Sequence, residues 1–115
     1  MQTRINTPSP ILQEQTIAML HELALPIHRR GYKQLCIGIP RFALDDTQSL
    51  SKDLYPYLAE YFNYSDWHAV ESSIRDVILD AWEHRNPDVW EKYFPNQTKV
   101  PSNKQFIATL AERLR

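Results

Sequence analysis

Residues 54–85 read LYPYLAEYFNYSDWHAVESSIRDVILDAWEHR, and two helical patterns lie within them. Apolar residues recur at helical spacing from 54 to 62, which predicts a first helix with one stripe against a core. They follow three- and four-residue steps for over four turns from 67 to 82, which predicts a second, longer helix. The rest of the chain is expected to pack around this pair.

The break at residues 63–65 predicts a turn between the two helices. Ser65 is the expected N-cap of the second helix, and Asp66 then places a carboxylate at the positive end of its dipole. A short helix, a turn and a longer helix form a helix-turn-helix, the unit that lays its second helix in the DNA major groove. The same spacing also describes an αα corner in any small helical bundle, so the pattern alone leaves both interpretations open. The second helix is acidic, which is unfavourable next to phosphates.

Length and composition predict one domain with a single core. The chain has 115 residues, of which 43% are hydrophobic, so wholesale disorder is not expected. The net charge of −1 lacks the strongly basic balance of many nucleic-acid binders, although it does not exclude a local basic patch. Cys36 is the only cysteine, which rules out an internal disulfide and suits a reducing cytoplasm.

The termini and the apolar runs indicate a cytoplasmic protein with no membrane contact. No apolar run is long enough to span a bilayer, and the N-terminus, MQTRINTPSP, is polar and broken by prolines. We expect residues 1–9 to be a flexible tail and residues 10–115 to be the domain.

Four further helices complete an all-α expectation of about six helices without strands. The first runs from about 11 to 24, where Pro26 ends it, and the second starts near His28 and continues past Leu35. Pro40 is expected to kink or end this second helix unless a new turn carries it on. Asn86 followed by Pro87 opens a short fifth helix. In the last helix, Ser102 and Gln105 form a capping box.

The most basic neighbourhood lies in the second helix. It contains Arg29, Arg30, Lys33 and Arg41. Such a run is either a solvated helix face or a patch that contacts phosphates, and the sequence leaves both open.

No pattern of residues predicts an enzyme. The four histidines have no recognised metal-ligand spacing, and Cys36 has no second cysteine in a CxxC pair. Asp80 and His84 are an i,i+4 pair, which is more typical of a surface hydrogen bond than of chemistry. We therefore expect no catalytic residue, no metal, no cofactor and no small-molecule substrate.

Four segments, in order along the chain, resemble one known family. That family is the C-terminal effector domain of the stage-zero sporulation response regulator of spore-forming Firmicutes. The segments are LHELALPIHRRGY (20–32), LYPYLAEYFN (54–63), VESSIR…AW (70–82) and PSNKQFIATLAERLR (101–115). The resemblance implies an all-α, six-helix domain with a helix-turn-helix. It also implies sequence-specific binding of double-stranded DNA at short promoter boxes, often by tandem copies that touch each other.

The resemblance also implies base-reading roles for two residues of the second helix. Glutamate and arginine of the family fall at Glu71 and Arg75, where the carboxylate can accept from cytosine N4 and the guanidinium can grip guanine O6 and N7. The chain departs from the family at Ser72, where an arginine is usual, at Asp76, where a histidine is usual, and at Val100, where a lysine is usual. The promoter box is therefore expected to differ from that of the family.

The sequence thus predicts a DNA-binding transcription regulator. No phosphorylatable receiver domain is recognisable, so we expect either an excised or separately encoded effector domain or a stand-alone relative. A homodimer or tandem copies on DNA are possible. The alternative is a protein-interaction module whose acidic second helix docks on a basic partner. Expected base contacts are Glu71, Ser72 and Arg75, with His68 nearby, and expected phosphate contacts are Arg29, Arg30, Lys33 and Lys104.

Overall fold

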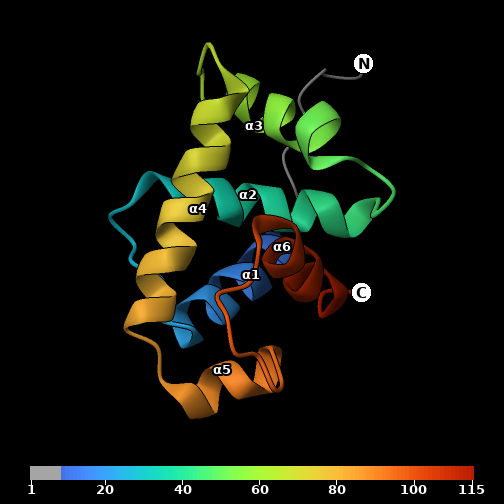
Figure 1. The fold of residues 1–115 in the computed structure, drawn as a ribbon. Coiled ribbons are helices and arrows are strands. Elements are labelled where there is room, and N and C mark those ends of the chain that lie inside the picture. Colours follow the sequence, from blue (N-terminus) through green and yellow to red (C-terminus); the bar gives the residue numbers. More distant parts are fainter. Residues whose placement is uncertain (1–8) are drawn as a thin grey trace.

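The fold is all-α, as expected, in the computed structural model, which describes residues 9–115 (Figure 1). The expected tail, residues 1–9, lies outside the described residues except for Ser9. No strand occurs among residues 9–115, and none of their helices is long and apolar enough to cross a bilayer. The elements are α1 (Pro10–Glu22), α2 (Arg30–Leu44), the π-helical turn η1 (Leu50–Leu54), α3 (Tyr55–Tyr61), α4 (Trp67–Glu83), α5 (Pro87–Tyr93) and α6 (Asn103–Glu112).

Helix α2 is the centre of the molecule, because α1, α3, α4 and α6 all pack against it (Figure 1). Its residues 31, 32 and 34–40 are all buried, so its inner surface is wider than a single amphipathic stripe. The helix begins at Arg30 rather than near His28, and it continues through Pro40 to Leu44 without ending at the proline.

Helix α1 ends two residues before the predicted boundary. Ala24 adopts a left-handed conformation with φ of 62°, and the N–H groups of Ala24 and Leu25 donate to the carbonyls of His21 and Leu20. This pattern is a Schellman motif, which satisfies the last helical carbonyls and reverses the chain before Pro26 is reached. Ile17 of α1 is 38% exposed, whereas Met19 and Leu20 of the same helix are buried.

Helix α3 ends in the same way, and this determines the turn that leads to α4. Asn63 has φ of 66°, and Tyr64 N–H donates to the Ala59 carbonyl at 2.7 Å. Asparagine tolerates the left-handed region, so it fills the position where such turns commonly carry glycine. The predicted N-cap was wrong by one residue: the side chain of Asp66, not Ser65, accepts the N–H of His68.

The caps of the last two helices follow the prediction in part. Asn86 accepts the N–H of Asp88, with Pro87 at the first helical position of α5. Ser102 accepts the N–H of Gln105 at 3.0 Å, which forms half of the predicted capping box. The other half is not made by the amide of Gln105, because that amide pairs with the amide of Gln97.

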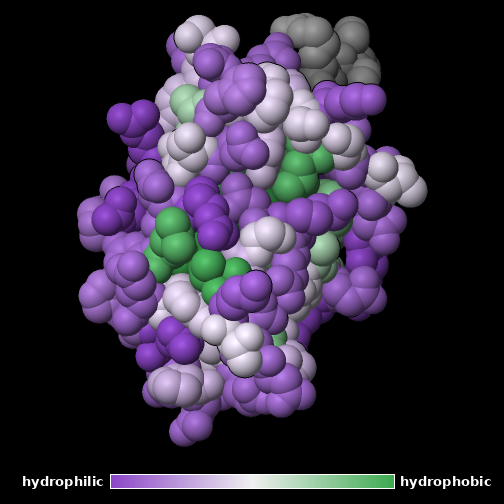
Figure 2. All heavy atoms as spheres, viewed as in Figure 1, coloured by the Kyte–Doolittle hydropathy of each residue, from purple (hydrophilic) through white to green (hydrophobic). Residues whose placement is uncertain are grey.

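The core lies between α2 and the helices around it, and the three tryptophans contribute unequally. Trp90 is 2% exposed, whereas Trp67 and Trp82 pack against the core from its edge. The face shown in Figure 2 is mainly hydrophilic, with separate hydrophobic patches between the polar side chains.

Candidate nucleic-acid interface

Helix α4 buries one side and exposes the other. Val70, Ile74, Val77 and Ile78 are fully buried, because they recur at helical spacing and face α2 and α3. The opposite side exposes Glu71, Ser72 and Asp76, and Arg75 is partly exposed between them. The residues expected to read bases therefore share the outward side of one helix.

The guanidinium of Arg75 is held by the chain that leads into α6. Its Nη1 donates to the Pro101 carbonyl at 2.9 Å. Arginine carries five N–H donors in a planar fork, so four remain for another acceptor. The contact fixes the direction of the side chain without consuming its capacity to bind.

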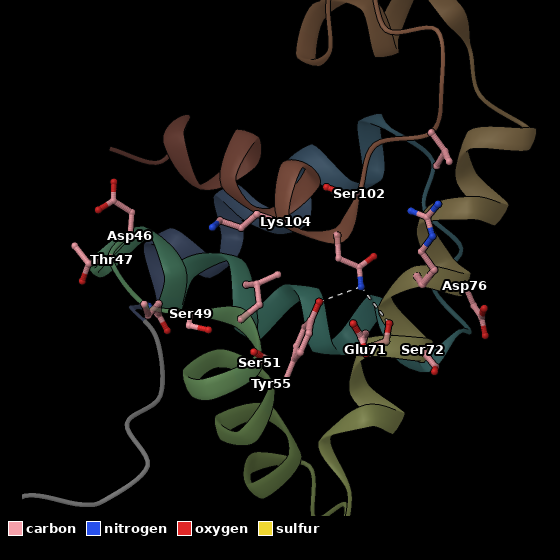
Figure 3. Close-up of a pocket in the computed structure, with 15 residues that line it drawn as sticks. Asp46, Thr47, Ser49, Ser51, Tyr55, Glu71, Ser72, Asp76, Ser102 and Lys104 are labelled. Carbon is pink, nitrogen blue, oxygen red and sulfur yellow. Dashed lines mark hydrogen bonds between the residues drawn. The ribbon is translucent and has the colours of Figure 1, made fainter.

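A hollow of about 950 Å³ lies along one flank of the exposed face of α4. Its walls are the exposed face of α4, the loop and turn before α3, and the N-terminus of α6 (Figure 3). It brings Lys104 of α6 to the same hollow as Glu71, Ser72 and Arg75. Lys104 is exposed, with its ammonium 5.8 Å from the centre of the Phe42 ring.

A second hollow, of about 480 Å³, lies along the other flank of the same face. Arg29 and Arg30 line it together with Ser72 and Asp76. The approach is close because Gly31 lies against α4: a Cβ added there would be 2.3 Å from the Ser73 carbonyl oxygen. Basic residues from two different elements thus flank α4 on both sides.

Arg29 is already paired in this arrangement. Its Nε donates to Asp80 Oδ2 at 2.8 Å, and this hydrogen bond is the main reason why the pKa of Asp80 lies below its usual value. Arg30 lies 6.0 Å from the centre of the Tyr64 ring, in the turn before α4. Lys33 is exposed on α2 but lines neither hollow.

His68 stands apart from the hollows, on the first turn of α4. Its ring is stacked on Trp67 at 3.9 Å between centroids, and Trp67 in turn stacks on Tyr55. Its Nδ1 lies 2.8 Å from Asp66 Oδ1, and its side chain is 63% exposed. The pKa of Asp66 lies below its usual value, mainly because its carboxylate accepts a hydrogen bond from the main-chain N–H of His68. The hydrogen bond with the His68 ring lowers it further.

Sequence reasoning missed two residues that hold this face. Pro101 contacts Arg75, and Asn103 contacts Tyr55 and the main chain of Glu71. Both lie in the segment that resembles the family's last helix, yet their partners are 26 to 48 residues away. No local pattern could reveal those contacts.

Comparison with known protein families agrees with the resemblance seen in the four segments. A family model described as Sporulation initiation factor Spo0A C terminal matches residues 16–114, which is nearly the whole chain. The family consists of DNA-binding regulatory domains and is not a known enzyme family. The chain therefore belongs to the sporulation initiation factor Spo0A C-terminal family, and it is an all-α DNA-binding domain of that transcription-regulating group.

Proposed function

We propose that this protein is a sequence-specific transcription regulator that inserts α4 into the DNA major groove. The observation that carries the proposal is the outward face of α4, where Glu71, Ser72 and Arg75 lie between Lys104 on one side and Arg29 and Arg30 on the other. A helix-turn-helix built from α3 and α4 would present this face to the base edges.

The two flanks suit the two phosphate backbones that border a groove. The B-DNA major groove is about 12 Å wide and admits one helix, so residues beside that helix meet the backbone. Lys104 stands on one side of α4, and Arg29 and Arg30 stand on the other. The positive ends of the α6 and α2 dipoles lie on those same sides, which favours phosphate further. Lys33, also exposed on α2, is proposed as a further phosphate contact.

The base-reading chemistry is distributed over two turns of α4. Glu71 can accept from cytosine N4, Arg75 can grip guanine in a bidentate contact, and Ser72 can donate or accept. His68, on the first turn, is the fourth candidate. Because Ser72 cannot make the bidentate contact of the family's arginine, the preferred sequence should differ from the family's box.

The regulator is proposed to act in the cytoplasm, where bacterial DNA lies, and to bind as tandem copies or as a homodimer on promoter boxes.

One observation favours a second candidate function: Glu71 and Asp76 put two exposed carboxylates on the outward face of α4. A protein-interaction module that docks this face on a basic partner is therefore the alternative.

Salt dependence separates the two candidates. Binding of a fluorescent random duplex, measured by anisotropy, should weaken steeply with added salt, with log K falling linearly against log salt concentration. Selection from a random pool should then yield a shared sequence. If the duplex gives no anisotropy change at low salt, the protein-interaction module replaces DNA binding as the function.

A further inference from the structure

We propose that Asn103 is a positioning residue that sets how α4 presents Glu71 and Arg75 to DNA. The inference rests on the proposed function, because it concerns the same face of α4. Asn103 is the first residue of α6, is 9% exposed, and touches both α3 and α4 through its side chain.

The side-chain amide of Asn103 joins three helices. Its Nδ2 donates to the Tyr55 hydroxyl of α3 at 3.1 Å and to the Glu71 main-chain carbonyl of α4 at 3.1 Å (Figure 3). The nitrogen has two protons, and both are used. A main-chain carbonyl can only accept, so the contact with Glu71 determines which end of the amide faces α4.

The carbonyl of Glu71 can make this contact without loss to its own helix. A helical carbonyl accepts one bond from the N–H four residues later and keeps a second lone pair. That later residue is Arg75. Asn103 therefore binds the turn of α4 that carries three of the four base-reading candidates, Glu71, Ser72 and Arg75.

A second tether reaches the same turn from the same segment. The carbonyl of Pro101, two residues before Asn103, accepts from Arg75 Nη1 at 2.9 Å. Pro101 is buried and its ring fixes its φ, which makes the segment stiff. Residues 101–103 thus hold α4 at two points one turn apart, one on the main chain and one on the arginine fork.

These tethers also fix the spacing between two kinds of DNA contact. Lys104, the proposed phosphate contact, follows Asn103 directly in α6. Its position relative to α4 is therefore coupled to the hydrogen bond between Asn103 and Glu71. A bidentate contact fails when its donors are displaced by a fraction of an ångström, whereas a phosphate contact tolerates it. Loss of the tether should therefore reduce discrimination between sequences more than general affinity.

Asn103→Asp is the most informative variant. Aspartate is nearly isosteric and suits the first position of a helix, and its carboxylate can accept from the Tyr55 hydroxyl. It cannot donate to the Glu71 carbonyl, so it removes the contact with α4, places a carboxylate beside that carbonyl, and keeps an acceptor for the Tyr55 hydroxyl. Tyr55→Phe is the matched control, since it removes the hydroxyl of the other contact and leaves the bond to Glu71 in place.

The readout is the ratio of the affinity for a selected duplex to that for a random duplex, at a temperature where circular dichroism shows each variant folded. Asn103→Asp should lower this ratio on the order of tenfold, comparable to one weakened bidentate contact. Its random-duplex affinity should fall no more than the ratio does, and Tyr55→Phe should keep the wild-type ratio. An unchanged ratio in Asn103→Asp, or an equal loss in Tyr55→Phe, overturns the inference.

Hydrogen exchange in the wild-type protein tests the inference if Asn103→Asp does not fold. The side-chain amide protons of Asn103 should be protected in the free protein and should stay protected in the complex with the selected duplex. Rapid exchange in the complex overturns the positioning role. A wild-type protein that selects no sequence defeats the proposed function itself, and that result is obtained before any variant is made.

Discussion

The guanidinium of Arg29 lies 2.8 Å from the carboxylate of Asp80, across the boundary between the α1–α2 connection and α4. A cation proposed to bind phosphate is therefore already neutralised by its own protein. Duplex binding must either break this pair or take place with one cation fewer.

Asp80→Asn should release Arg29 for the DNA backbone. We expect random-duplex affinity to rise a few-fold and the slope of log K against log salt to steepen by about one. Glu83→Gln is the control, because it removes a negative charge from the same helix at an exposed position. Equal effects in the two variants would mean that only net charge changes, and that Arg29 does not reach the backbone.

Asp80 also binds His84, and this makes part of the stability depend on pH. His84 Nδ1 lies 3.0 Å from the Asp80 main-chain carbonyl and 3.1 Å from its carboxylate. The main-chain hydrogen bond first, and the carboxylate charge next, raise the pKa of His84 above its ordinary value. A raised pKa means that the folded state favours the protonated ring.

The stabilisation by His84 should be fully present below the ordinary histidine pKa of about 6.5 and lost as the pH rises through the folded value. Urea unfolding of wild type and His84→Gln should therefore differ most in mild acid and converge toward high pH. In Asp80→Asn, the His84 titration midpoint measured by NMR should fall only in part, since the main-chain bond remains. A wild-type midpoint at or below 6.5 would contradict the contact.

The close crossing of α2 and α4 should make Gly31 intolerant of any side chain. A Cβ there would be 2.3 Å from the Ser73 carbonyl oxygen and 2.7 Å from a methyl of Val77. Gly31→Ala should lower the free energy of unfolding by about 1–3 kcal/mol, as overpacking does. It should also weaken duplex binding, because it pushes Arg29 and Arg30 away from α4.

Gly38 of the same helix provides the control for helix propensity. Its added Cβ would be 3.1 Å from a flexible methyl of Leu58. Gly38→Ala should stay within about 1 kcal/mol of wild type, since the gain in helix propensity offsets the small displacement of Leu58. Urea unfolding measures both variants. If Gly31→Ala is as stable as Gly38→Ala, the two helices do not cross as closely as described.

The parts of the fold that depend on neighbouring residues could be predicted from the sequence. Asn86 with Pro87, and Ser102 at α6, are caps whose chemistry is complete within three residues. Where two good caps stand side by side, as at Ser65 and Asp66, local chemistry does not choose between them. Gln105 shows the other limit, because its amide has a partner in Gln97 from a different segment.

The candidate interface also has a part that the sequence could predict and a part that it could not. Helical period and family resemblance predicted that Glu71, Ser72 and Arg75 share one face of α4, and that face is exposed. The contacts that hold the face join residues far apart in sequence, such as Arg29 with Asp80, and no periodicity encodes them. Gln34 of α2 is fully buried, and its side-chain amide has no hydrogen-bond partner among residues 9–115, a feature that no sequence pattern predicts.

Arg75→Lys should separate base reading from charge. Lysine keeps the positive charge but loses the planar fork, so random-duplex affinity and the salt slope should change little. Discrimination between the selected and random duplex should fall by about 1–3 kcal/mol, the value of one bidentate contact. Competitive anisotropy titrations measure both quantities.

Lys33→Ala is the comparison, and it should weaken all duplexes alike and reduce the salt slope by about one. The reverse pattern, with Lys33→Ala relaxing preference and Arg75→Lys weakening every duplex equally, would place the base-reading surface on α2 instead of α4.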